Sequence, residues 1–553
     1  MKRTALVISV LFFIIISTNV NAAKLVDIKV IDKEYLWVQF KDGDVCFVDD
    51  GLGSLAFTGD HQTSNNYKVT YGTGLNTTNA VATANWTIKC AADPNYGTSG
   101  RNPSNCYRKS KLNGMAEMDW NTPGNDWNYE YTMKHAIYLR LPYPMGQGNS
   151  YTIEINANTN SDVLSRAVTF DIFSSRSEAI HVNLVGYLAD SSIKAVDLYM
   201  WMGNGGARSY STFVGKKVYI YNVDTAATQE VGTVQFWKSS SSNDVGWFNL
   251  TMSDVWKADF TGFNTPGRYR IVIEGIGCSE DFEIKKDVYF EPFRVSTIGY
   301  FYMRIGQDTN YPGMPVPRRP LYIPYVSPTS TRVYITTMSP IHPEWDTFSG
   351  GDVWDNPGAW DPYKKPGNPQ NNNAYGGHSD AADWDRHLGH ISNIYDMLLP
   401  YILTDGRLND DDLGIAESGN GIPDILDEAR NEVDFWLRLK DGDGYSHGLT
   451  NPNGSNYLYQ AGTTPIAAWA NAANAAMLAN CFMLAGLDSL RDTYRDAAIT
   501  AYNYASGLAD PMLSATQNVG DITVRGKDLK MMAAAFLYNV TGNTVYEDML
   551  NSL

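Results

Sequence analysis

Hydrophobic and polar residues alternate in short runs over about the first 285 residues of the chain. A period of two is typical of strands with one buried face, and turns rich in Gly, Asn and Asp separate the runs. Clear examples are residues 35–40, 136–139, 217–221 and 269–273. The pattern predicts antiparallel β-sandwiches, and we place two such modules, at residues 23–178 and 179–285.

From about residue 286 the hydrophobic residues recur with the period of amphipathic helices. After a helix-like stretch near 290–303, helices are predicted at residues 382–403, 423–440, 462–485, 489–507 and 526–540. An all-β front and an all-α back indicate a multidomain chain rather than one α/β fold. Residues 308–379 show no periodicity and are dense in Pro, Gly, Asn and Trp; a loop of that length is usually functional or disordered.

The first 22 residues are predicted to be a secretory signal peptide. Lys2 and Arg3 precede an apolar run at residues 5–16, and Val20-Asn21-Ala22 is similar to a cleavage site. The run is too short for the roughly 20 residues of a membrane-spanning helix. We therefore expect a secreted or periplasmic protein that has no membrane partner once the signal is removed.

The chain is acidic and rich in aromatic residues. It carries 60 Asp and Glu against 43 Lys and Arg, a net charge of −17, which argues against a nucleic-acid partner. The 35 Tyr and 14 Trp suit flat, neutral, hydrogen-bonding ligands such as sugars. Five Cys allow at most two disulfides, of which Cys90–Cys106, flanking a loop rich in Gly, Asn and Pro, is favoured. No two Cys have the spacing of a zinc site.

The most informative segment runs from Tyr375 to His387. Gly376 and Gly377 permit a tight turn, and Asp380 and Asp383 follow at a predicted helix start. Residues three apart share one face of a first turn, where helix amides favour ionised carboxylates. The pair could hold a water molecule with one Asp acting as a base, or it could be an N-cap and a solvated first-turn acid.

This segment resembles the Gly-Gly-…-Asp-Ala-Gly-Asp signature of glycoside hydrolase family 9, with Ala382 where Gly is usual. The resemblance implies that Asp383 is the general base and that Asp380 helps to hold the attacking water. The methyl group of Ala382 leaves the exact substrate open.

Three further segments carry the same resemblance, which together covers about residues 179–553. They are Glu417–Arg430, similar to a helix-opening motif, Lys527–Lys530 with the alanines that follow, and Ile180–Tyr187. The resemblance implies an immunoglobulin-like domain at 179–285 and the N-terminal portion of an (α/α)6 barrel at 286–553. For Glu417, Glu428 and Glu432, capping and dipole effects are the favoured explanation. Residues 23–178 resemble only a β-sandwich.

Other residues are candidates for sugar contacts, with packing as the alternative for each. They are Tyr375, His378, Trp384 and His447, together with the long-loop aromatics Trp345, Trp354, Trp360 and Tyr363. The oxygen-rich turn at residues 405–412 could hold a structural calcium ion, although a solvated acidic loop is favoured. No other metal and no organic cofactor are expected.

The sequence thus predicts a secreted, inverting β-1,4-glucan hydrolase of the endoglucanase type. The alternatives are an exo-acting β-glucosidase or glucosaminidase, and a non-catalytic glycan-binding protein. Inversion also requires a general acid, which the resemblance implies to be a Glu near the end of the catalytic domain, and no segment matches its surroundings. Because the barrel needs twelve helices and about six are predicted, the chain is expected to be a fragment of a longer enzyme.

Overall fold

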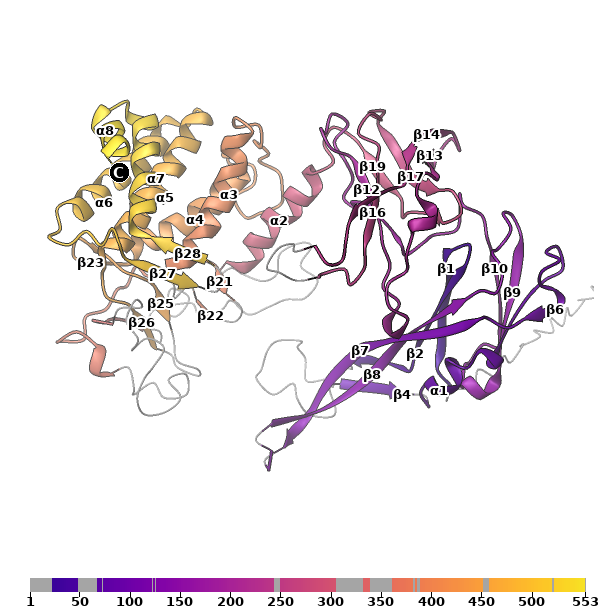
Figure 1. Ribbon diagram of the computed structural model, residues 1–553. Coiled ribbons are helices and arrows are strands. Elements are labelled where there is room, and N and C mark those ends of the chain that lie inside the picture. The colour runs from indigo at the N-terminus through magenta and orange to yellow at the C-terminus, as the bar shows by residue number, and fades with distance from the viewer. Residues whose placement is uncertain are drawn as a thin grey trace, which may run out of the picture. The chain divides into compact units, whose positions relative to one another are not determined.

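The structure is a computed structural model, shown in Figure 1. It describes residues 22–47, 67–71, 73–121, 123–124, 126–242, 249–304, 332–338, 361–380, 383–384, 388–450, 457–519 and 522–552. The chain divides into two compact units, which we call the β unit (residues 1–290) and the helical unit (residues 291–553). The predicted order of an all-β front and a mainly helical back is confirmed. Residues 1–21 of the predicted signal peptide lie outside the described residues.

The first part of the β unit contains two four-stranded sheets with a shared hydrophobic core. One has the order β1-β2-β8-β7, with strands Lys24–Asp32, Tyr35–Lys41, Asp126–Arg140 and Asn105–Asn121. The other has the order β10-β9-β5-β6, with strands Ser165–Thr169, Ser150–Ile155, Trp86–Cys90 and Gly97–Arg101. The alternating residues Leu36, Val38 and Phe40 of β2 point into this core, as the period of two predicts. The short elements α1 (Thr77–Ala80), β3 (Gly43–Phe47) and β4 (Tyr67–Tyr71) complete this part.

The second part of the β unit has its own core between two further sheets. The first has the order β11-β12-β16-β15, with strands Ile180–His181, Ala195–Leu198, Val255–Asp259 and Gln235–Lys238. The second has the order β14-β13-β17-β18, with strands Thr228–Thr233, Lys217–Asn222, Gly267–Ile273 and Gly277–Cys278, and β19 (Phe282–Ile284) pairs with β17. An immunoglobulin-like topology for this part stays a prediction.

The two parts of the β unit are packed into one body. Tyr35 and Tyr138, from strands of the first part, belong to the hydrophobic core of the second. Arg208 of the second part donates to Asp32 at 2.8 Å and to Glu34 at 2.9 Å, and the Asp32 side chain is fully buried. Removing one partner of a buried ion pair is costly, so these contacts hold the two parts together.

The favoured Cys90–Cys106 disulfide is wrong. Both cysteines are free: Cys90 ends β5 in one sheet, and Cys106 lies on β7 in the other. The chain between them forms β6, so the residues that flank the loop enter different sheets. Burial raises the pKa of the Cys106 thiol to about 12, which keeps it protonated and unreactive in the folded protein.

We expect iodoacetamide to label Cys90 and Cys106 completely in denaturant without a reductant, and only slowly in the native protein. Peptide mapping by mass spectrometry, with a pre-reduced sample as the control, measures this. A cross-linked peptide that contains both residues would contradict the structure.

The described helices of the helical unit are α2 (Phe290–Met303), α3 (Ser392–Leu403), α4 (Asp424–Arg438), α5 (Pro465–Leu484), α6 (Asp488–Ser506), α7 (Gly526–Thr541) and α8 (Thr544–Ser552). They lie close to the predicted ones, except that α3 begins at residue 392 rather than 382 and that α8 follows the last predicted helix. Helix α5 is buried along almost its whole length, and its alanines let neighbouring helices approach closely. Thr464 caps it by accepting from the Ala467 N–H, and Pro465 is its first residue. Whether these helices belong to an (α/α)6 barrel stays a prediction.

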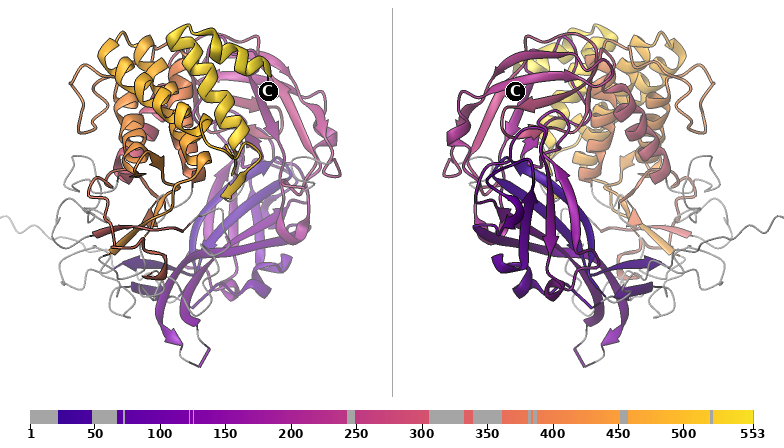
Figure 2. Two further views of the ribbon diagram at one scale, coloured as in Figure 1. Left: turned by 90° about the vertical axis from the view of Figure 1, so that its left-hand side faces the viewer. Right: turned by 90° about the vertical axis from the view of Figure 1, so that its right-hand side faces the viewer.

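Short strand pairs gather at one end of these helices (Figures 1 and 2). They are β20 (Arg332–Ile335) with β26 (Tyr457–Gln460) and β25 (Leu449–Thr450), β21 (Ser379–Asp380) with β22 (Asp383–Trp384), β23 (Lys440–Asp441) with β24 (Gly444–Tyr445), and β27 (Thr516–Val519) with β28 (Ile522–Arg525). Within the described part of the chain, no helix combines the length and apolarity that crossing a bilayer requires.

Candidate active site

Asp380 and Asp383 lie on a two-strand hairpin, not on the first turn of a helix. Strands β21 and β22 pair antiparallel, with Asp380 directly opposite Asp383 in the backbone register. Among the described residues that follow, helical conformation is found in a 3-10 turn at Leu388–Ile391 and then in α3. The predicted helix start at residue 382 is therefore wrong. The side chains of Asp380, Asp383 and Trp384 are outside the described part of the structure.

The two glycines before the hairpin have backbone angles that other residues rarely adopt. Gly376 has φ = 92° and Gly377 has φ = 81°. A Cβ atom on Gly377 would lie 2.8 Å from the ring of Phe435 on α4. The predicted tight turn is confirmed, and the glycines also allow the chain to approach helix α4 closely.

His378 follows the glycines and is buried between two glutamates of α4. Its Nε2 lies 2.7 Å from Glu428 Oε1, and its Nδ1 lies 2.8 Å from Glu432 Oε2. The imidazole is 1% exposed and both carboxylates are fully buried. Burial lowers the pKa of His378, but the hydrogen bonds to Glu428 and Glu432 outweigh it and raise the pKa to about 10. His378 is therefore a cation at neutral pH, with its Nε2 hydrogen-bonded to Glu428 and its Nδ1 within ion-pair distance of Glu432.

Arg304, just after α2, extends this buried cluster. Its guanidinium contacts Glu428 Oε2 at 2.9 Å and Glu417 Oε1 at 2.8 Å. Arg304 also forms a backbone bridge with His378, and the Trp436 indole donates to Glu432 Oε1 at 2.7 Å. The cluster thus ties α2 and α4 to the segment that ends at Asp380. It anchors the backbone that leads into strand β21.

The prediction that capping and helix-dipole effects explain Glu428 and Glu432 is therefore wrong. Glu428 and Glu432 lie beyond the first turn of α4 and neutralise buried cations rather than cap the helix. Burial raises the pKa of the neighbouring Asp427 to about 6, although its carboxylate accepts from Asn420 Nδ2. A sequence signal existed, since Glu428 and Glu432 are four residues apart on a helix face that also carries buried Phe435 and Trp436.

The other candidate sugar contacts lie in different surroundings. Tyr375 is 37% exposed, and its ring stacks on the Arg438 guanidinium at 4.2 Å. His447, after β24, is fully buried. The imidazole rings of His378 and His447 are thus both enclosed by protein. Substrate contact by Tyr375, His378, Trp384 or His447 stays a prediction. Tyr363 packs beside a small core of Tyr334, Met338, Tyr459 and Ala461, whereas Trp345, Trp354 and Trp360 are not among the described residues.

In the acidic turn at residues 405–412, Asp411 accepts hydrogen bonds from nearby backbone N–H groups. The Asp411 carboxylate accepts from the backbone N–H groups of Gly419 and Gly421, each at 2.7 Å, and these bonds lower its pKa. Asp424 Oδ2 accepts from Leu413 N–H and from Ser418 Oγ. The described residues contain no group of three or more His, Cys, Asp or Glu side chains placed to hold a metal ion. A structural calcium ion stays a prediction.

The chain is similar in sequence to enzymes named as endoglucanases. No protein-family model matches it. Two curated sequences named Endoglucanase D, both from Acetivibrio thermocellus, are 24% identical over 386 residues and match 66% of this chain. The match covers 52% of one and 50% of the other, so the chain spans about half the length of these relatives. The sequence similarity to endoglucanases that the motifs indicate is therefore confirmed.

The chain is also similar to solved structures that are described as family 9 glycoside hydrolases. A metagenome-derived glycoside hydrolase family 9 endoglucanase is 22% identical with a TM-score of 0.49, covering 68% of this chain and 63% of that chain. The GH9 protein of Bacteroides ovatus is 20% identical with a TM-score of 0.48, covering 68% of this chain and 64% of that chain.

Proposed function

We propose that the chain is part of a secreted endo-β-1,4-glucanase that cleaves with inversion, using Asp383 as the general base and Asp380 to hold the water. The observation that carries the proposal is the direct backbone pairing of Asp380 with Asp383 at the end of a segment anchored by the His378 cluster. A catalytic carboxylate must be positioned by rigid surroundings, and buried ion pairs on both ring nitrogens of His378 supply such an anchor.

The chemistry follows from the pair of acids. In an inverting glycosidase one carboxylate removes a proton from water while an acid on the other face protonates the leaving oxygen. Asp383 takes the first role in this proposal. Neighbouring Asp380 accepts a hydrogen bond from the same water, and Tyr375 provides an exposed ring for a sugar face. No organic cofactor is needed, and a calcium ion would be structural.

We expect the full-length natural protein to reduce the viscosity of soluble cellulose derivatives faster than it releases reducing ends, because internal cleavage shortens chains early. NMR of fresh products from cellohexaose should show inverted, α-configured ends. Release of glucose or glucosamine from chain termini alone would favour the exo-acting alternative, and glucan binding without any turnover would favour a non-catalytic glycan-binding protein.

A further inference from the structure

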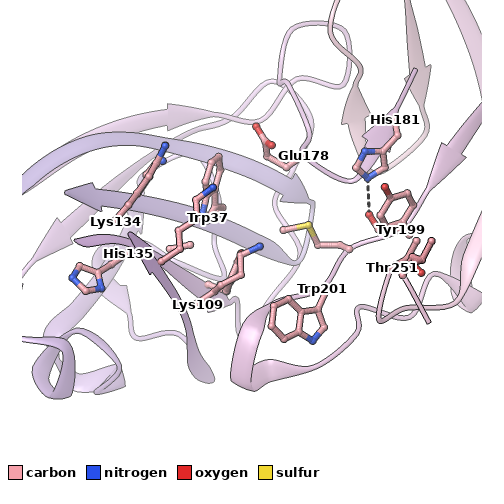
Figure 3. Close-up of a pocket in the computed structure, with 15 residues that line it drawn as sticks. Trp37, Lys109, Lys134, His135, Glu178, His181, Tyr199, Trp201 and Thr251 are labelled. Atoms are coloured by element: carbon pink, nitrogen blue, oxygen red, sulfur yellow. Dashed lines mark hydrogen bonds between the residues drawn. The ribbon is translucent and has the colours of Figure 1, made fainter. Parts of the chain in front are cut away.

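The β unit contains a cavity of about 420 Å³ that is separate from the candidate active site. Roughly 300–1,000 Å³ is the usual range for small-ligand sites. One wall is the outer face of the sheet β1-β2-β8-β7, and the other comes from residues around β11 and β12 of the second part (Figure 3). The packing that joins the two parts therefore also forms this cavity.

Strand register places three lysines on the same sheet face. Lys109 of β7 is paired with Ala136 of β8, which is paired with Gln39 of β2. One row further, Lys111 is paired with Lys134. Side chains alternate between the two faces of a strand, and the residues on either side of Gln39, Val38 and Phe40, lie in the hydrophobic core on the opposite face. The three ammonium groups therefore belong to the face that lines the cavity.

The cavity carries a net positive charge in a chain whose net charge is −17. Its acidic residue, Glu178, already pairs with Lys29 at 2.6 Å. Across the described part of the chain, neither Lys109, Lys111 nor Lys134 forms an ion pair. Burial and the neighbouring Lys111 lower the pKa of Lys109, so an anion beside it would relieve an unfavourable charge.

Aromatic side chains form much of the remaining lining. The His181 ring stacks on Tyr199 with centroids 3.9 Å apart, and Lys109 Nζ lies 5.5 Å from the Trp201 ring. Trp37 rises from the sheet and Trp201 faces it from the other wall (Figure 3). The buried Trp37 Nε1–H has no hydrogen-bond acceptor within the described structure. The cavity thus offers aromatic faces and lysine ammonium groups without ion-pair partners side by side.

We propose that this cavity binds an acidic saccharide, namely a glycan segment that carries uronic acid residues. A uronate presents an apolar C–H face for the aromatic rings and a carboxylate for the lysines. A neutral glucan would leave the lysines without a partner, and a simple anion would leave the aromatic lining unused. The inference does not depend on the proposed hydrolase activity.

Calorimetric titration of the full-length protein tests this with two probes of equal length and linkage. The hexamer of α-1,4-linked galacturonic acid is the acidic probe, and maltohexaose is its neutral counterpart; neither contains a β-1,4-glucan bond. We expect saturable binding of the acidic hexamer with one site, at least about tenfold tighter than maltohexaose, since one charge-assisted hydrogen bond accounts for about that factor.

Matched variants locate the binding. Lys109→Gln combined with Lys134→Gln should weaken binding of the acidic hexamer by about tenfold or more, and Trp201→Ala should weaken both probes. Lys217→Gln and Trp237→Ala, at exposed positions away from the cavity, should change neither. If the double variant unfolds at a lower denaturant concentration than the natural protein, Lys111→Gln, at an exposed position of the same face, replaces it and should also weaken binding of the acidic hexamer. Equal affinity for both probes, unchanged affinity in the cavity variants, or equally tight binding of hexaglutamate would overturn the proposal.

Discussion

Replacement of Asp383 by alanine is expected to lower kcat on soluble β-1,4-glucan by at least two to four powers of ten. General-base assistance is worth about 10²–10⁴ in rate, and the variant also loses one of the groups that position the water. KM should change little, because the base acts on water rather than on the sugar. Initial rates of reducing-end release, measured on the full-length protein, provide both constants.

The control variants separate a catalytic role from a structural one. Asp380→Ala should reduce kcat less than Asp383→Ala, since its proposed role is to hold the water. Asp488→Ala changes an exposed acid in the first turn of α6 and should leave kcat unchanged. Wild-type turnover by Asp383→Ala, with unchanged unfolding, would refute the assignment of the base.

The helices could be predicted from the sequence because their signal is local. The sequence predicts a helix at residues 423–440, and α4 runs over Asp424–Arg438; it predicts another at 462–485, and α5 runs over Pro465–Leu484. In both helices the amphipathic or apolar pattern is continuous, and Pro marks the start. Such features do not depend on the rest of the chain.

The start of α3 could not be predicted in this way. Asp380-Ala381-Ala382-Asp383 has the composition of a helix start, yet Asp380 and Asp383 lie on paired strands, next to a residue that contacts distant parts of the chain. Arg304 pairs with the His378 backbone, and α4 supplies the two carboxylates that hold the imidazole. Local preference is overridden by these long-range contacts. The same limit applies to the cavity of the β unit, whose lysines lie together only in the register of β7 and β8.

In the candidate site, too, some features could be predicted from the local sequence and others could not. Asp380 and Asp383 stand out from the sequence because a short motif carries them. The role of His378 as an anchor cannot be recognised in the sequence, because a histidine two residues before an acid suggests a cleft residue as readily as a buried cation. Charged residues on the otherwise apolar face of α4 were the available clue, since buried charges are rare unless they are paired.

Replacement of His378 by alanine is expected to destabilise the helical unit by about 3–5 kcal/mol, the usual cost of removing one partner from a buried ion pair. The reason is that Glu428 and Glu432 would remain fully buried with less positive charge beside them. Denaturant unfolding followed by circular dichroism at 222 nm reports on the helices. His181→Ala, which changes a half-buried histidine of the β unit, is the matched control and should not shift that transition.

The same ion pairs predict how stability depends on pH. The pKa of His378 in the folded protein is raised from 6.5 to about 10, so the folded state binds the proton more tightly than the unfolded state does. The stabilisation is complete below about pH 6.5 and is lost progressively as the pH rises toward 10. The free energy of unfolding of the helical unit should therefore fall over this range in the natural protein, and it should fall less steeply in His378→Gln, which cannot titrate. Parallel pH profiles for the two proteins would show that His378 is not held as a buried cation.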